Sequence, residues 1–218
     1  MTSVTIAQGL TLDEEMFERS LEAVRECVPD RAPTFTWEFF TTRENWLLIP
    51  DVEHPEEPWY KAELVIKQGA PYLQTNKLNV WRRPDLRRSG APMPHSHPWR
   101  KFTGHLLMGG YKEDRYEVER ASVLSEDPFS EADLGGVHVK QDVIHQAGQR
   151  NLIDETTFHE VTEVLEPGRT LSLMDCGPGR KEGWGYLDPE TGLYLPNKKS
   201  PSDPRFKKLF LDRNPHLK

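Results

Sequence analysis

The sequence predicts an all-β fold, a sandwich or barrel of short strands with one helix before it and a polar tail after it. Only one stretch near the start, residues 11–28, carries apolar residues at helical spacing. From there to residue 187, short segments rich in β-branched and aromatic residues alternate with turn residues, a pattern typical of sandwiches and barrels. From residue 188 onward the chain is polar and contains several prolines, which favours a tail that wraps the barrel.

The predicted N-terminal helix covers residues 11–28 and ends at Pro29. Thr11 can cap its first turn, with Glu14 in the position of a capping box. Four apolar residues form one stripe along it, which would face the rest of the protein: Leu12, Met16, Leu21 and Val24.

Ten segments after the helix are predicted to be strands. They are residues 34–40, 46–49, 62–67, 77–82, 104–111, 116–123, 136–140, 156–164, 170–176 and 183–187. The Pro-rich stretch 84–94 is predicted to be a loop, and 206–211 a short helix in the tail. We therefore divide the chain into an N-terminal helical segment (1–30), a β-barrel domain (31–187) and a C-terminal tail (188–218) that belongs to the same domain.

The overall charge excludes some classes of partner. The formal net charge is −7 and the sequence pI is near 5.7, which argues against binding nucleic acid. The apolar runs are too short to span a membrane. Two cysteines, Cys27 and Cys176, lie far apart in a chain with no visible export signal, so we expect reduced thiols and a cytoplasmic location.

One pair among the eight histidines has a spacing that points to a metal. His95 and His97 are two residues apart, so on a strand both imidazoles project from the same face. The prolines of the segment Pro94-His95-Ser96-His97-Pro98 favour extended backbone around this pair. Two imidazole nitrogens on one strand face suit a single metal ion.

The spacing of the following residues resembles the two motifs of the cupin superfamily, G-x5-H-x-H-x3-4-E-x6-G and G-x5-P-x-G-x2-H-x3-N. Set on His95 and His97, the first motif ends at Gly109, and the second, begun at Gly148, places its histidine at His159. The resemblance covers residues 77–187 and is similar in detail to uncharacterised bacterial cupins. It implies a double-stranded β-helix, also called a jelly-roll barrel, whose metal is held by His95, His97 and His159.

The chain departs from the first motif at Phe102, which stands where the cupin pattern has a glutamate ligand. The resemblance then implies a site of three neutral histidines, similar to cysteine dioxygenase and other three-histidine oxygenases, with open positions for substrate and dioxygen. Fe(II) is the metal we expect, but imidazole also suits Zn, Ni, Mn or Cu. Metal affinity should fall as the pH falls through the histidine range, because the ligands must be neutral.

Five residues are predicted to line a substrate pocket beside this site: Arg82, Trp99, Phe102, Tyr111 and Glu163. Arg82 could bind a substrate carboxylate bidentately. The alternation of residues 158–164 puts Val161 and Glu163 on the strand face of His159.

Three further histidines are candidate ligands. His105 should point away from the site, because it lies three residues beyond Phe102 on the same predicted strand. His138, on a short strand, or His145, in a predicted turn, could take the place of His159. The catalytic residues remain open.

The leading functional hypothesis is a mononuclear non-haem iron oxygenase acting on a small polar molecule. One alternative is a non-redox isomerase, decarboxylase or lyase that uses Zn, Ni or Mn as a Lewis acid. Another is a ligand-binding cupin with a closed, structural metal site. A homodimer is expected, because cupins often pair through sheet edges.

Overall fold

Antiparallel strands form most of the regular structure in the described part of the chain, which confirms the predicted all-β class. The computed structural model describes residues 2–69, 75–86, 91–121, 124, 127, 129–177, 184–197 and 204–218. The largest sheet has six strands in the order β10 (Arg150–Asp154), β6 (Lys101–Met108), β12 (Thr170–Cys176), β5 (Thr75–Trp81), β4 (Lys61–Gln68) and β3 (Trp46–Ile49). A three-stranded sheet has the order β11 (Thr157–Val164), β7 (Gly110–Val118) and β9 (Val137–Gln146).

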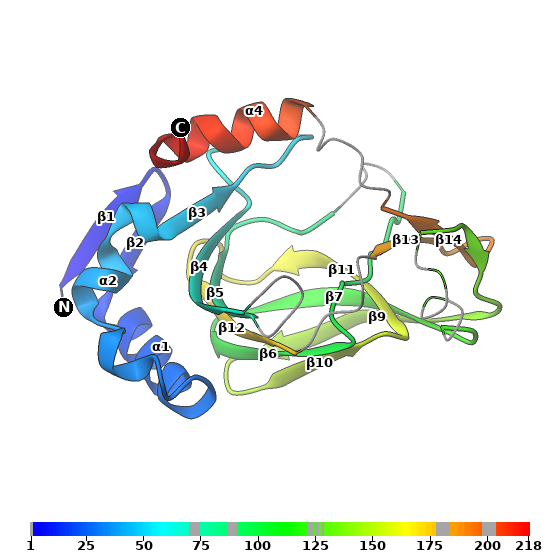
Figure 1. Cartoon of the computed structure of the whole chain (residues 1–218), viewed down its shortest axis with the longest axis horizontal. Helices are drawn as coiled ribbons and strands as arrows, with labels where there is room; N and C mark the ends of the chain where they lie inside the picture. Colours follow the sequence, from blue (N-terminus) through cyan, green and yellow to red (C-terminus); the bar gives the residue numbers. More distant parts are fainter. Residues whose placement is uncertain are drawn as a thin grey trace.

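Two smaller sheets flank this body. The first pairs β1 (Ser3–Ala7) with β2 (Leu10–Asp13), and the second has the order β13 (Gly185–Asp188), β14 (Leu193–Pro196) and β8 (Ala132–Asp133). Figure 1 shows them at opposite ends of the molecule, with the two larger sheets between them.

The six-stranded and three-stranded sheets pack face to face. Trp81 of β5 lies against Tyr111 of β7, with ring centroids 5.6 Å apart. Leu106 of β6 and Val161 of β11 belong to the same buried cluster. The interior that the histidines face is therefore the space between these two sheets.

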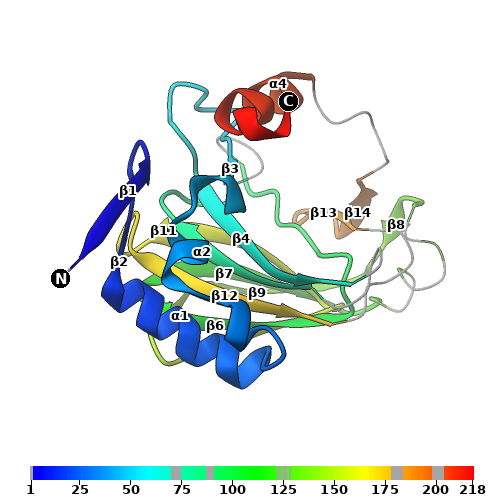
Figure 2. The same cartoon turned by 60° about the vertical axis from the view of Figure 1, so that its left-hand side comes forward.

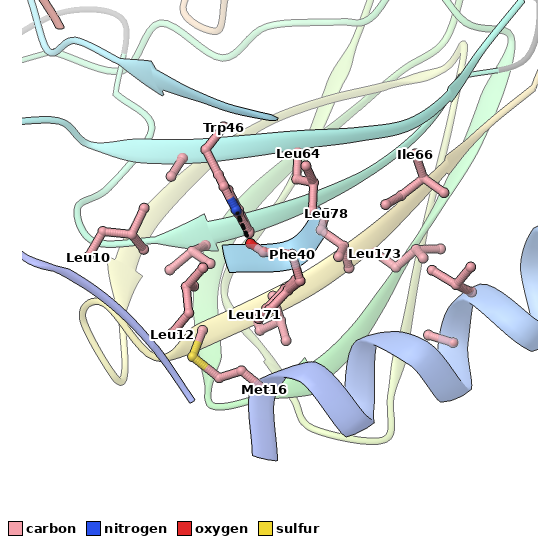
Figure 3. Packing of buried hydrophobic residues seen from close by; sticks show 14 of the residues in the cluster. Leu10, Leu12, Met16, Phe40, Trp46, Leu64, Ile66, Leu78, Leu171 and Leu173 are labelled. Atoms are coloured by element: carbon pink, nitrogen blue, oxygen red, sulfur yellow. Dashed lines mark hydrogen bonds between the residues drawn. The ribbon is translucent and has the colours of Figure 1, made fainter. Parts of the chain in front are cut away.

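The outer face of the six-stranded sheet carries the largest apolar core. Helix α1 (Glu14–Cys27) lies across it, against β6 and β12 (Figure 2). Leu64, Leu78, Leu171 and Leu173 point from the sheet toward the helix, where Met16 meets them (Figure 3). Burying each such side chain contributes about 1.5–3 kcal/mol, so this core anchors the strands whose other face lines the interior.

The N-terminal helix is shorter than predicted. Residues 10–13 pair with β1 as β2, and the helix begins at Glu14. Its N-cap is Asp13, whose carboxylate accepts a hydrogen bond from the backbone N–H of Met16 (2.9 Å). Thr11 therefore does not cap the helix, because its backbone is already committed to the hairpin.

The predicted strand 34–40 was wrong. The structure has a 3-10 helix η1 (Ala32–Thr34) and a short helix α2 (Trp37–Thr41) there, followed by η2 (Arg43–Asn45). The Thr36 hydroxyl caps α2 by accepting from Phe39 N (3.1 Å). The aromatic residues that suggested a strand instead pack on α1, with Phe35 stacked on Phe17 at 5.7 Å.

Other strand boundaries also differ from the predictions. The predicted strand 104–111 is broken at Gly109, which has a positive φ of 61° and a position where a Cβ would lie 2.6 Å from Thr170 Oγ1. The chain turns there from one large sheet into the other. Strands β7 and β9 are longer than predicted, and β1, β2, β8, β10 and β14 were not predicted. Val123 and Gly183, where two predicted strands end or begin, lie outside the described residues.

The C-terminal tail forms α4 (Pro204–Arg213) and the 3-10 helix η3 (Pro215–Leu217), which extends the short helix predicted at 206–211. Between them, the fully buried Asn214 pairs with the edge strand β3 much as another strand would. Its Oδ1 accepts from Leu48 N (2.8 Å), and its Nδ2 donates to Leu48 O (2.9 Å) and to Phe210 O (2.8 Å).

Replacing Asn214 with alanine is expected to lower the free energy of unfolding by about 2 kcal/mol, because it leaves buried backbone groups of Leu48 without partners. Urea unfolding of Asn214→Ala measures this. The matched control is Asp212→Ala in the same tail, an exposed residue paired with Lys218, which should change stability by less than about 0.5 kcal/mol. Equal effects of the two substitutions would contradict the role given to Asn214.

None of the described helices has the length and apolarity needed to cross a membrane. The division of the chain into residues 1–30, 31–187 and 188–218 stays a prediction.

Candidate metal centre

The backbone around His95 is held between two sheets. His95 and His159 of β11 exchange two backbone hydrogen bonds, each 3.0 Å long. On the other side, the N–H of Ser96 donates to the carbonyl of Gly185 in β13 (2.9 Å). The segment that carries the histidine pair is therefore inserted as a short extended link between β11 and β13, which fixes the direction of its side chains.

His95, His97 and His159 come together as predicted from their spacing. One ring nitrogen from each lies within 4.8 Å of the others. The ring centroids are 4.9, 4.9 and 5.1 Å apart, and Nε2 of His97 is 2.8 Å from Nε2 of His159. His95 and His159 are buried and His97 is half-buried, so the cluster opens on the side of His97.

This donor set fits a divalent metal ion. Nε2 of His97 and Nε2 of His159 lie 2.8 Å apart, close enough for both to bind one ion. Nitrogen ligands suit iron, zinc, nickel and copper alike. Within the described residues, the group contains no carboxylate, which agrees with a site of three neutral ligands.

Glu113 of β7, fully buried, holds His159 from behind. Its Oε2 accepts from His159 Nδ1 (2.9 Å) and Asn151 Nδ2 (3.0 Å), and its Oε1 from His145 Nε2 (3.0 Å) and Arg115 Nη1 (3.2 Å). Burial alone would raise the pKa of Glu113, but the hydrogen bonds from His145 and His159 hold it well below its ordinary value. An ionised carboxylate at Nδ1 keeps the proton there and leaves Nε2 free to bind a metal.

Aromatic rings lie beside His95 and His97. Phe102, 2% exposed, meets His97 edge-on with centroids 4.6 Å apart. Trp99 lies 6.3 Å from His97, and Trp184 lies 6.4 Å from His95. Phe102 stands at the sequence position of the motif glutamate, so the site has an apolar ring beside His97.

Two other predicted pocket residues lie further from the cluster. The hydroxyl of Tyr111 accepts from Asn151 Nδ2 (2.9 Å), which places it in the layer behind Glu113. Burial raises the pKa of Tyr111 above its ordinary value, so the hydroxyl stays protonated. Arg82 is not brought to the histidines: its Nη1 donates to Glu57 Oε2 (2.5 Å), and its guanidinium lies over Trp59.

Glu163 is also kept away from the site. The register of β11 against β7 shifts between Val161 and Glu163, and such a bulge reverses the alternation of side chains beyond it. Val161 stays buried on the face of His159, whereas Glu163 is exposed and pairs with Lys112 (2.6 Å).

The remaining candidate ligands do not join the cluster within the described residues. His105 points to the outer face of its sheet, as expected, where Nε2 lies 3.8 Å from Cys27 Sγ. His145 lies in strand β9 and not in a turn; it supports Glu113 rather than replacing His159. His138 is exposed near the start of β9.

The residues that support His159 from behind, Glu113 and Asn151, were not predicted from the sequence. Residues 112–115 are charged and were left between two predicted strands, although Tyr111 and Glu113 alternate as one strand face would require. Asn151 lies in β10, which was not predicted. Continuing the alternation of Tyr111 through the charged run would have placed Glu113 in the interior.

No protein-family model and no curated protein matches the chain. Solved structures similar to it include hydroquinone 1,2-dioxygenase PnpCD in complex with Cd2+ and 4-hydroxybenzonitrile (10% identity, TM-score 0.34, 53% of this chain and 63% of that chain). Hydroxypropylphosphonic acid epoxidase from S. wedmorenis is another (10%, 0.32, 54% and 50%). A third is an RmlC-like cupin protein from Ralstonia eutropha JMP134 (12%, 0.34, 72% and 74%). The matched parts thus cover less than two thirds of the first two proteins, and likenesses of this size say nothing of substrate or reaction.

Proposed function

We propose that the protein is a metal-dependent cupin in which His95, His97 and His159 bind one divalent ion, Fe(II), and that it oxidises a small polar molecule with dioxygen. The observation that supports this most is the convergence of three imidazole nitrogens, with no carboxylate oxygen among the candidate ligand atoms of the described residues. Phe102, which stands at the fourth-ligand position of the motif, packs beside His97. A divalent ion held by neutral ligands alone keeps its full charge and its open positions, where Fe(II) can activate dioxygen and other metals can polarise a substrate oxygen.

The protein residues would act by positioning and by excluding water. Glu113 fixes the ring of His159 and keeps the proton on Nδ1. Phe102 and Trp99 present apolar surface beside His97, from which a bound substrate would displace water. His97, the most exposed of the three ligands, marks the side from which a substrate would enter.

The same histidines also suit a non-redox enzyme, an isomerase, decarboxylase or lyase that uses Zn, Ni or Mn as a Lewis acid. It would differ from the oxygenase in the metal bound and in activity that persists without oxygen. A cytoplasmic location, small-molecule substrates and a homodimer complete the proposal; the two free thiols, Cys27 and Cys176, are in keeping with a reducing compartment.

Elemental analysis of anaerobically purified protein tests the metal site. Wild-type protein is expected to hold about one ion per chain, and His97→Ala to lose it, because removing one of three ligands opens the site. The matched control is His105→Ala, which removes a histidine on the outer face and should leave the metal content unchanged. Metal retained by His97→Ala at the wild-type level would refute the site.

The identity of the element and oxygen consumption then separate the two functions. Iron together with substrate-dependent uptake of dioxygen, measured with an oxygen electrode across thiols, amino acids and diketones, supports the oxygenase. Zinc, nickel or manganese with no oxygen uptake supports the non-redox enzyme.

A further inference from the structure

The inner face of the six-stranded sheet carries a row of polar residues that the histidine site does not use. On β5, Lys77, Asn79 and Trp81 alternate with the outward-facing Leu78 and Val80. The register places Asn79 beside Glu63 of β4 and beside Ser172 of β12. Polar residues on the inner face of a sheet need an explanation, because burying a polar group costs free energy unless the group is hydrogen-bonded or paired.

Two observations place this row opposite the histidines. At one end, Trp81 packs in the same cluster as Val161, two residues along β11 from His159. At the other end, Phe102 lies against His97, and Phe102 pairs across the sheet with Cys176 of β12.

The cross-strand rows that fall between these two ends are those of Asn79 with Ser172 and of Lys77 with Met174. Both side-chain rows project into the interior, as does His159 from the other sheet. Lys77 and Asn79 therefore project into the same interior as His159, from the opposite sheet.

The polar groups of this wall are only partly satisfied by the protein. Asn79 is 1% exposed, and its Oδ1 accepts no hydrogen bond from any described residue. Lys77 Nζ donates to Glu63 Oε1 (2.8 Å), which leaves two of its three N–H groups available. Ser172 Oγ accepts from Trp81 Nε1 (3.0 Å) and retains its own hydrogen to donate. The wall thus offers donors at Lys77 and Ser172 and an acceptor at Asn79.

We propose that Lys77 and Asn79 form the substrate-recognition wall of the histidine site, and that they select a small carboxylate carrying an O–H or N–H donor next to its carboxyl group. The carboxylate oxygens accept from Lys77, and the neighbouring donor satisfies Asn79 Oδ1. This proposal rests on the proposed function, because it assigns the substrate class of the same site. A positively charged metal on the opposite side would favour the same anionic ligand.

Glycolate tests the proposal, since it is the smallest carboxylate with an adjacent hydroxyl, and acetate is its counterpart without the donor. Dissociation constants for both are measured by saturation-transfer NMR on the full chain and on His97→Ala. Glycolate should bind wild-type protein about tenfold more tightly than acetate, the worth of one buried hydrogen bond. His97→Ala should keep the same ratio of glycolate affinity to acetate affinity. Loss of the metal can therefore be distinguished from a failure of Lys77 and Asn79 to bind the ligands.

Two variants test the proposed contacts of Asn79 and Lys77 with the ligand separately. Asn79→Leu, which removes the amide at similar volume, should bring the glycolate-to-acetate ratio to about one without lowering the unfolding midpoint, because the Oδ1 that it removes accepts no hydrogen bond from any described residue. Lys77→Met should weaken both ligands by about tenfold or more. Lys67→Met is the matched control: this lysine of β4 also pairs with a carboxylate, Asp30, but at the surface, and its removal should change neither constant.

Three results overturn the proposal: no glycolate binding to wild-type protein, equal affinities for glycolate and acetate, or wild-type ratios in Asn79→Leu. If Lys77→Met does not fold, Lys77→Gln is used in its place, with the same expected weakening. Wild-type affinities in a folded Lys77 variant would also refute it.

Discussion

Replacing Glu113 with glutamine is expected to weaken metal binding by about 10- to 100-fold. Four donors converge on the Glu113 carboxylate, from His159, Asn151, His145 and Arg115. A glutamine amide has one oxygen to accept and an NH2 group that must itself donate. Whichever way it turns, its NH2 faces donors, so either His159 loses its orienting partner or Arg115 and His145 lose theirs.

The measurement is a competition titration of Zn2+ against a fluorescent chelator, with circular dichroism to establish that each variant is folded. Glu117→Gln is the matched control, because Glu117 lies on the same strand but pairs at the surface with Lys140 (2.7 Å). It should bind Zn2+ as wild-type protein does. A folded Glu113→Gln protein with wild-type zinc affinity would show that the carboxylate does not position His159.

The three histidines could be predicted because local spacing carried the information. His95 and His97 needed only an extended backbone to share a face, and the interval from Gly148 to His159 supplied the third ligand by resemblance. The strands 46–49 and 170–176 were predicted with the bounds that the structure has. These segments are buried and β-rich, so local preference and tertiary packing agree.

The predictions from the sequence were wrong where tertiary contacts outweigh local conformational preference. The aromatic run 34–40 has the composition of a strand. It forms helical turns instead, and Phe35 of this run stacks on Phe17 of α1. A bulge that no local signal announces removed Glu163 from the face of His159. Arg82 was attractive as a carboxylate ligand, but its partner Glu57 lies 25 residues earlier in the chain, a distance over which spacing rules say nothing.

The charged residues of the barrel interior were the hardest to foresee, because charge in a sequence usually indicates solvent. Lys61, Glu63 and Lys77 alternate with apolar residues, as on a strand with one face in water. The structure turns that face inward, where Glu63 pairs with Lys77 (2.8 Å) and Lys61 (3.1 Å). Burying these charges is tolerable only because they compensate one another.

This pairing gives the protein an acid-sensitive component of stability. Burial alone would raise the pKa of Glu63, but Lys77 and Lys61 lower it from 4.5 to about 2. A carboxyl whose pKa falls this far on folding contributes about 3 kcal/mol to the free energy of unfolding above pH 4.5. The contribution is lost as the pH falls from 4.5 to 2, because the folded state must then take up the proton that the unfolded state has already bound.

Urea unfolding at a series of pH values should therefore show the pH-dependent contribution of Glu63 to the free energy of unfolding. Glu63→Gln is expected to be less stable than wild-type protein at neutral pH, since two buried ammonium groups lose their carboxylate. Between pH 4.5 and 2, however, its free energy of unfolding should fall by about 3 kcal/mol less than that of wild-type protein. Glu163→Gln, which removes an exposed carboxylate paired with Lys112, should follow the wild-type curve. If the Glu63→Gln curve ran parallel to the wild-type curve over this range, the buried pairing would contribute nothing that depends on pH.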